Sequence, residues 1–398
     1  MYTELAKLFY SDKENYKRTF ETRFNDPEVV RLDFKIGENQ AFFLPIPELL
    51  RSLAEIRKLD KNIYILKSSL PSVALGQFIN RCLVDEIELT NDIEGIRSTR
   101  RELNDILADM EIKNTPKRFW GIVHKYSLLI RQETIQLQTC MDIRNIYDEL
   151  VYAEIAEDDN KNIPDGEIFR KSSTSVTSGT QKEIHRGLYP ESKIISSMEK
   201  ALLILHDEKI DIFFRIAAFH YFFGYIHPFY DGNGRTSRFI SSYLLSQELE
   251  PLVGYRLSYT VRENLKSYYR AFEVCNNPTS MGDITPFIIM FINIVEESMV
   301  LLEEALKRKK GEYDIYCELI PKLHKGGDTK FAKLYNLLIQ ASLFSDEGIS
   351  TRKLLKALKI SRQTLRNRLK ELDSSILVEN SISGEKFYHL DITKLSAI

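Results

Sequence analysis

The sequence predicts a mainly helical protein, and three observations support this fold class. Glycine and proline, which interrupt helices, are scarce, with 17 and 12 copies in 398 residues, whereas leucine, isoleucine, glutamate and lysine are abundant. Apolar residues recur at spacings of three and four along most of the chain, as on one face of a helix. Near the C-terminus, two short helical patterns precede two strand-like runs, the order of a winged helix-turn-helix.

The overall composition, 43% hydrophobic and 28% charged, is typical of soluble globular domains. A formal net charge of -2 gives no reason to expect that the whole chain binds nucleic acid or a membrane. The four cysteines include no CxxC pair, which argues against a zinc ribbon or a disulfide scaffold. Because no signal peptide and no apolar run of about 18 residues is recognised, we expect a cytoplasmic protein without a membrane partner.

Taken in order, the chain begins with a predicted N-terminal extension, residues 1–75, in which prolines break the helix before residue 48. Helical patterns follow at residues 48–59, 73–87, 98–110, 118–139 and 142–156, and residues 90–95 are predicted to interrupt the second of these. Residues 157–188 are rich in polar and turn-forming types, which indicates strands or a hairpin. Helices resume at residues 193–205, 213–226, 235–247, 262–275 and 286–310.

The last of these helices ends in four cations and Gly311, which indicates a helix C-terminus and a domain boundary near residue 310. The predicted domains are therefore the extension, a core at residues 76–310, and a winged helix-like domain at residues 311–398. In that last domain, residues 348–370 carry only basic charges: Arg352, Lys353, Lys356, Lys359, Arg362, Arg366, Arg368 and Lys370.

In a helix-turn-helix, Arg362, Gln363 and Arg366 would face the DNA groove, so DNA is one expected partner. The alternative is a solvated basic face on a domain that docks on the core or on a protein partner. The sequence leaves both open.

The residues that carry chemistry lie at residues 227–238, which form a short loop after one helical run and the start of the next. Gly232 and Gly234 let the backbone adopt positive φ and approach a ligand closely. Backbone N–H groups that lead into a helix N-terminus bind anions. Arg235 and Arg238 lie three residues apart on the following helix, so both are expected to reach the same anion.

Two further side chains in this loop suit phosphate chemistry. His227 has an ordinary pKa that suits a general base near neutral pH. Asp231 offers the hard oxygen ligand that Mg²⁺ takes beside phosphates. We therefore predict a phosphate-binding loop with a base beside it.

The pattern H-x-F-x-D-G-N-G-R-x-x-R at residues 227–238 closely resembles the signature of the Fic family. The resemblance implies a helical core with a small flap hairpin and, most often, transfer of AMP from ATP to a hydroxyl of a target protein. His227 would take the proton of the attacking Ser, Thr or Tyr hydroxyl, and Asp231 would hold Mg²⁺ on the phosphates. The residues implied to hold the phosphates are Gly232, Asn233, Gly234, Arg235 and Arg238.

Two other stretches resemble the same family. Tyr268 and Asn276 match the segment in which a tyrosine and an asparagine line the adenosine end of the nucleotide, although Tyr268 also suits a core aromatic. Residues 183–191 lie where the family has a flap hairpin that pins a target peptide by strand addition. No single flap residue is assigned a role.

Thr90, Glu94 and Gly95 resemble the family's inhibitory motif, [S/T]-x-x-x-E-[G/N]. A Glu94 carboxylate against Arg238 would occupy the guanidinium that the γ-phosphate needs, within the same chain. Taken alone, Thr90 also suits a helix cap. The resemblance therefore implies a self-inhibited enzyme.

Two alternatives stay open beside this adenylyltransferase. One is a DNA-binding regulator in which the core senses a nucleotide, although an intact His227 favours an enzyme. The other is an enzyme of the same family that removes AMP or transfers another phosphate-containing group. Three other histidines lack the spacing of a metal site and are expected to be structural or surface residues: His185, His206 and His220. A second copy of the chain is a further partner to consider.

Overall fold

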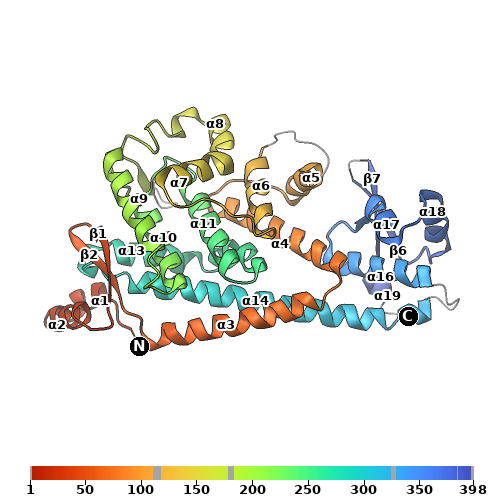
Figure 1. Cartoon of the computed structure of the whole chain (residues 1–398), viewed down its shortest axis with the longest axis horizontal. Helices are drawn as coiled ribbons and strands as arrows, with labels where there is room; N and C mark the ends of the chain where they lie inside the picture. Colours follow the sequence, from red (N-terminus) through yellow and green to blue (C-terminus); the bar gives the residue numbers. More distant parts are fainter. Residues whose placement is uncertain (1, 111–117, 178–182, 324–328, 383, 396–398) are drawn as a thin grey trace. The chain divides into compact units, whose positions relative to one another are not determined.

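The computed structural model describes residues 2–110, 118–177, 183–323, 329–382 and 384–395, and it is mainly helical, as predicted (Figure 1). Contacts between Cα atoms divide the chain into two compact units. The first unit comprises Met1–Asp60 and Asp85–Met299, and the second comprises Lys61–Val84 and Val300–Ile398. The division at residues 75 and 310 stays a prediction, and the contacts place residues 1–60 in the same unit as most of the predicted core.

The N-terminal part of the first unit holds two helices and a hairpin: α1 (Leu5–Ser11), α2 (Lys13–Phe24), β1 (Val30–Ile36) and β2 (Asn39–Phe43). The hairpin is absent from our sequence prediction, although the β1 residues alternate between apolar and polar types and Gly37 turns the chain with a φ of 59°. Phe42 N–H donates to Gly282 O at 3.0 Å, and Ile284 N–H donates to Phe42 O at 2.9 Å. The hairpin is therefore bonded to the segment that leads into α14 of the first unit.

The centre of the first unit is α10 (Ile212–Ile226), which is apolar and buried on nearly all sides, as expected for a core helix. It packs against α9 (Glu191–Leu205) and α11 (Asn233–Glu248) (Figure 1). The loop between α10 and α11 carries the predicted site. Other helices of this unit are α5 (Arg100–Met110), α6 (Trp120–Leu129), α7 (Cys140–Tyr147), α8 (Ala153–Asp158), α12 (Leu257–Glu263) and α13 (Leu265–Asn276).

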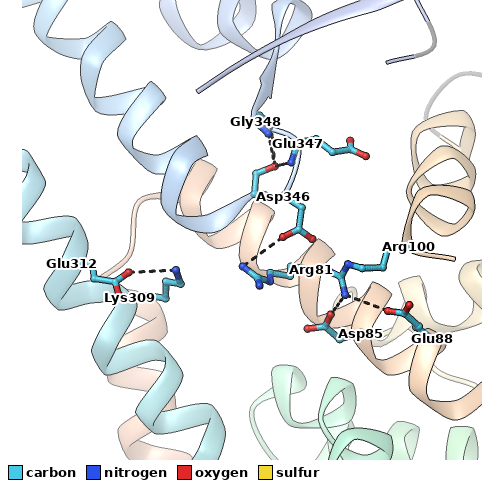
Figure 2. A network of polar contacts seen from close by, with 10 residues as sticks. Arg81, Asp85, Glu88, Arg100, Lys309, Glu312, Asp346, Glu347 and Gly348 are labelled. Atoms are coloured by element: carbon cyan, nitrogen blue, oxygen red, sulfur yellow. Dashed lines mark hydrogen bonds and ion pairs between the residues drawn. The ribbon is translucent and has the colours of Figure 1, made fainter. Parts of the chain in front are cut away.

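Three long helices contribute residues to both units: α3 (Pro47–Ser68), α4 (Ser72–Ile93) and α14 (Thr285–Cys317). The predicted interruption at residues 90–95 is wrong, because α4 continues through Ile93 and the chain turns at Gly95, with a φ of 73°. In the first unit, Arg100 of α5 pairs with Asp85 and Glu88 of α4 (Figure 2).

Two other predicted helix ends are also wrong. Residues 118–139 do not form one helix, because α6 ends at Leu129 and the side chain of Thr139 begins α7 in a capping box. The helix predicted to end at Lys310 continues through Gly311, and pairs such as Lys307–Glu303, 2.9 Å apart, support its later turns.

The second unit contains α15 (Ile320–Leu323), α16 (Thr329–Phe344), α17 (Thr351–Leu358), α18 (Arg362–Glu371), α19 (Ile392–Leu395), and the strands β5 (Ile349–Ser350), β6 (Leu377–Ile382) and β7 (Glu385–Leu390). The strands form an antiparallel sheet in the order β5-β7-β6. Arg81 pairs with Asp346 within this unit (Figure 2). The predicted helices and hairpin are present, while the winged helix assignment stays a prediction.

Among the described residues, the segment Thr285–Leu323 has the length and apolar composition of a membrane-spanning helix. However, 56% of its most apolar window is buried inside the protein. The core helix of a soluble protein has the same properties.

Candidate active site

The loop between α10 and α11 is held in shape by its own side chains. His227 ends α10 in the left-handed conformation, with a φ of 52°. Phe229 is fully buried and stacks on Tyr147, which anchors the loop on the core. Asn233 closes the loop, because its Oδ1 accepts from Phe229 N–H at 3.0 Å and its Nδ2 donates to Phe229 O at 2.8 Å. Asn233 was predicted to hold phosphate, and here both ends of its amide hold the loop.

The loop leads into the N-terminus of α11, as an anion site requires. Gly232 is the N-cap residue, with a φ of 78° and no side-chain cap. Asp231 Oδ1 accepts from Gly232 N–H at 2.5 Å, which turns this carboxylate toward the start of the helix. The N–H groups in the first turn of a helix have no acceptor within that helix, so they are available to an anion.

The imidazole of His227 is neutral at pH 7. Burial, together with the charges of Arg170 and the nearby His185, lowers its pKa to about 3, against a bond to the Gly224 backbone that raises it. A neutral imidazole can accept a proton. A bound phosphate would raise the pKa of His227, because a nearby negative charge favours the protonated ring.

Arg235 pairs with a glutamate. Its side chain is wholly buried, and one terminal nitrogen donates to both carboxylate oxygens of Glu154 on α8, at 3.0 and 2.9 Å. Its Nε and its other terminal nitrogen are buried without a hydrogen-bond partner among the described residues. The expectation that both arginines reach one anion stays a prediction. Residues three apart on a helix point about 60° apart around its axis, and Glu154 satisfies the charge buried on that side.

Arg238 faces the end of α4 instead. It donates to Glu94 Oε1 at 2.7 Å, to Thr90 Oγ1 at 2.8 Å and to Thr90 O at 3.0 Å. The carboxylate of Glu94 raises the pKa of Arg238, against burial, which lowers it. The structure thus brings the residues of the inhibitory pattern onto the predicted arginine, and inhibition itself stays a prediction.

Glu94 also lies directly over the anion loop. A Cβ atom added to Gly234 would stand 2.0 Å from Glu94 Oε1 and 2.9 Å from a terminal nitrogen of Arg238. Only glycine therefore lets this carboxylate approach the start of α11 so closely. Gly95 follows with positive φ and turns the chain away.

The polar groups of Tyr268 and Asn276 are engaged inside the core. Tyr268 is buried, and its hydroxyl group lies 2.7 Å from His220 Nε2, whose other ring nitrogen lies 2.8 Å from Ser241 Oγ. Asn276 Oδ1 accepts from the Tyr221 hydroxyl at 2.8 Å. The adenosine-binding role of Tyr268 and Asn276 stays a prediction.

The predicted flap is present in part. β3 (Ser175–Thr177) pairs antiparallel with β4 (Glu183–Arg186), and its tip at residues 178–182 lies outside the described residues. Gly187 N–H donates to Thr174 O at 3.1 Å, and Leu188 N–H donates to Ile226 O at 3.0 Å. The base of the flap is therefore bonded to the end of α10, beside His227.

Two buried ionisable residues near the site were not predicted. Glu86 accepts from Ser258 N–H with both oxygens, at 3.0 and 2.9 Å, and burial raises its pKa to about 7. Its spacing of four residues from Thr90 puts it on the same face of α4, a signal that the sequence contained. The sequence contains no comparable spacing pattern for Arg170, because its partners are backbone carbonyls, which every residue type has.

Comparison with known proteins was consistent with this site. Residues 139–245 match the model of the Fic/DOC family. The chain is 34% identical over 125 residues to a protein adenylyltransferase Fic of Drosophila virilis, and 34% identical over 82 residues to that of Drosophila melanogaster. These matches cover 27% and 21% of this chain and only 24% and 15% of the two relatives.

One solved structure shares the fold over most of the chain. It is a Fic family protein from Desulfovibrio desulfuricans, with a TM-score of 0.52, 20% sequence identity, and coverage of 87% of this chain and 96% of the other. At that identity the likeness concerns the fold alone. The family match contains the loop at residues 227–238, whereas Thr90, Glu94, Tyr268 and Asn276 lie outside it. Residues 139–245 thus form a Fic/DOC family domain.

Proposed function

We propose that the protein is an adenylyltransferase that transfers AMP from ATP to a Ser, Thr or Tyr hydroxyl of a target protein, and that Glu94 inhibits it. The observation that carries the proposal is the arrangement around α11. A neutral His227 stands before an uncapped helix N-terminus, and Arg238 beside that terminus is held by Glu94. The likeness to curated adenylyltransferases over part of the chain supports the same reaction.

In the proposed reaction, the oxygen of the target hydroxyl attacks the α-phosphorus of ATP while His227 takes the hydroxyl proton. The bond between the α-phosphorus and the bridging oxygen breaks, and pyrophosphate leaves. The N–H groups at the start of α11 would hold phosphate oxygens. Most of the rate acceleration would come from positioning and from neutralising the phosphate charge.

Magnesium fits this site through Asp231. Mg²⁺ beside a nucleotide takes one or two protein carboxylates and obtains its other ligands from phosphates and water. The described part of the chain contains no group of three or more His, Cys, Asp or Glu residues that could hold a metal alone. A single carboxylate next to an anion site suits an ion that arrives with ATP, and that ion would supply positive charge to the phosphates.

Inhibition follows from competition for Arg238. Glu94 occupies one terminal nitrogen of this guanidinium, and its carboxylate lies over Gly234 at the start of α11. The γ-phosphate of ATP would be repelled from the same space and would lose its cation. ATP could then bind only with its α-phosphate misaligned for attack.

The proposal is tested with the Glu94→Gly variant, ATP, Mg²⁺ and candidate target proteins, followed by mass spectrometry. We expect targets to gain one AMP, and the double variant Glu94→Gly with His227→Ala to add none. A folded Glu94→Gly protein that incorporates no nucleotide would contradict the proposal. Incorporation of a different mass would indicate transfer of another group, and release of AMP from modified targets would indicate the reverse reaction.

A second candidate function, DNA binding by the C-terminal domain, is favoured by its exposed cations. Arg362 and Arg366 are exposed on α18, and Lys353 and Lys356 are exposed on α17. Phosphate contacts by such residues would make binding weaken steeply with salt. We expect a DNA gel shift at low salt that Arg362→Glu with Arg366→Glu abolishes. If the wild-type chain binds no DNA at low salt, a protein partner is favoured. A cytoplasmic location and pairing with a second copy stay predictions.

A further inference from the structure

Arg170 lies between the flap and the loop that carries His227, and its side chain is wholly buried. Its Nε donates to His227 O at 2.9 Å, and one terminal nitrogen donates to Leu188 O at 2.8 Å. The other terminal nitrogen donates to Ser172 O. The backbone N–H of Arg170 also donates to Pro228 O at 3.2 Å. One residue thus joins three segments through four hydrogen bonds to backbone carbonyls.

The charge of Arg170 is buried, and the hydrogen-bond partners of its guanidinium group are neutral backbone carbonyls. Burial lowers the pKa of Arg170, against the charge of nearby Asp165, which raises it. Oδ1 of Asp165 accepts from the backbone N–H of Lys171 and from the hydroxyl of Tyr230. Burying a charge is a costly way to stabilise a fold, so the three-way link points to a role beyond stability.

Arg170 packs closely between Gly187, at the base of the flap, and His227. A Cβ atom on Gly187 would stand 2.4 Å from a terminal nitrogen of Arg170 and 2.9 Å from the Cβ of His227. The left-handed backbone of His227 is uncommon for a residue with a side chain, and the bond from Arg170 to its carbonyl group helps to hold it.

We propose that Arg170 is a positioning residue, which ties the substrate-binding flap to the catalytic loop so that a target hydroxyl and His227 stay in register. This inference rests on the proposed function. The guanidinium would act through the backbone of His227 and Leu188, without touching the nucleotide. Its positive charge has a second effect, because after burial it is the next largest cause that lowers the pKa of the nearby imidazole.

The first test compares variants in the active Glu94→Gly background. Arg170→Met keeps the volume of the side chain but loses every donor, and we expect kcat to fall about 100-fold, as for a misplaced catalytic group. Affinity for ATP should stay within about threefold, because the phosphate-binding groups are untouched. Arg170→Lys keeps the charge but cannot reproduce the three hydrogen bonds of the guanidinium group. Its kcat should therefore lie between that of Arg170→Met and that of the background.

Arg144→Met is the matched control. Arg144 also donates to a backbone carbonyl, that of Ile168, at 2.8 Å, but it does not contact the loop of His227. We expect its kcat to stay within about threefold of the background, because positioning at the reacting centre is unchanged. The inference is overturned if kcat of Arg170→Met is unchanged, if ATP affinity falls in parallel with kcat, or if Arg144→Met is equally impaired.

A second measurement separates this inference from the proposed function, because it needs no activity. Amide hydrogen exchange reports on the bonds that close the flap base, Gly187 N–H to Thr174 O and Leu188 N–H to Ile226 O. In Arg170→Met we expect these two amides to exchange at least about tenfold faster, while protection across α10 is retained. Unchanged exchange would overturn the link even if AMP transfer is confirmed. Faster exchange with no AMP transfer in the Glu94→Gly background would overturn the proposed function only.

Discussion

Arg235 and Arg238 lie one turn apart on α11, and each is buried against a glutamate from a different helix. In the pair of Arg235 with Glu154, both side chains are buried, with exposed fractions of 0% and 5%. In the pair of Arg238 with Glu94, the arginine is 1% exposed but the glutamate is 27% exposed. Both arginines belong to the same short sequence pattern, yet only one of the two carboxylates can reach water.

This difference separates a structural pair from a pair that can open. Removing one partner of a fully buried ion pair leaves an unpaired charge in the core, which is strongly destabilising. Glu94 can leave Arg238 at a lower cost, because water can solvate its carboxylate and a phosphate can replace it. We infer that Arg235 maintains the fold of the site, whereas Arg238 is available for regulation.

The largest expected effect is on stability and comes from the buried pair of Arg235 with Glu154. Glu154→Ala should lower the free energy of unfolding by about 3–5 kcal/mol, because Arg235 would stay buried without its carboxylate. Urea denaturation measures this change. A loss below about 1 kcal/mol would contradict the interpretation of this pair as structural, because Arg235 would then be hydrogen-bonded to another acceptor or to water.

The same substitution at the other pair should mainly change activity. A hydrogen bond to a charged group is worth about 1.5–3 kcal/mol, so Glu94→Ala should raise the initial rate of AMP transfer about 10–100-fold. The free energy of unfolding should fall by less than half of the loss in Glu154→Ala. Equal destabilisation by the two substitutions, without a gain in rate, would show that both pairs are structural.

Thr90 offers a smaller effect on the same arginine. Its hydroxyl accepts from Arg238 Nε at 2.8 Å. This bond also has a charged donor, but Thr90→Ala leaves the bonds of Arg238 to Glu94 and to the Thr90 backbone carbonyl in place. Thr90→Ala should therefore raise the rate of AMP transfer only about 2–10-fold. Thr90→Ser, which keeps the hydroxyl group, is the matched control. If Thr90→Ala and Thr90→Ser are both as slow as wild type, Thr90 does not help to hold Arg238.

The smallest effect comes from Glu86, a buried carboxylate that accepts from a backbone N–H. Its pKa is raised from 4.5 to about 7 in the folded protein. Its contribution to stability is present below the unfolded pKa and is lost as the pH rises through the folded pKa. From pH 6 to pH 8 the free energy of unfolding should fall by about 1 kcal/mol through this group. Glu86→Gln should remove that pH dependence, and an identical slope in the variant would assign it elsewhere.

The sequence predicts correctly the features that depend on residues close together in the chain. The loop at residues 227–232 lies between two helices, as its glycines and flanking apolar runs predicted, and α11 begins at Asn233, two residues before the predicted start. The spacing of Thr90 and Glu94 on one helix face was also informative. The prediction is wrong at residues 90–93, which stay helical and place the buried side chain of Thr90 against Arg238.

The sequence alone determined the chemical content of the site: a histidine, a carboxylate, glycines that admit an anion, and two arginines at a fixed spacing on one helix. These features depend on the order of residues in the chain and on helix geometry, and both involve only residues that are close together in the sequence. Tertiary structure decided which carboxylate each arginine contacts, because Glu154 on α8 and Glu94 directly after α4 are distant from α11 in the chain. It alone placed Arg170 between the flap and His227. Its partners are backbone carbonyls, which every residue type provides, so no sequence pattern marks them.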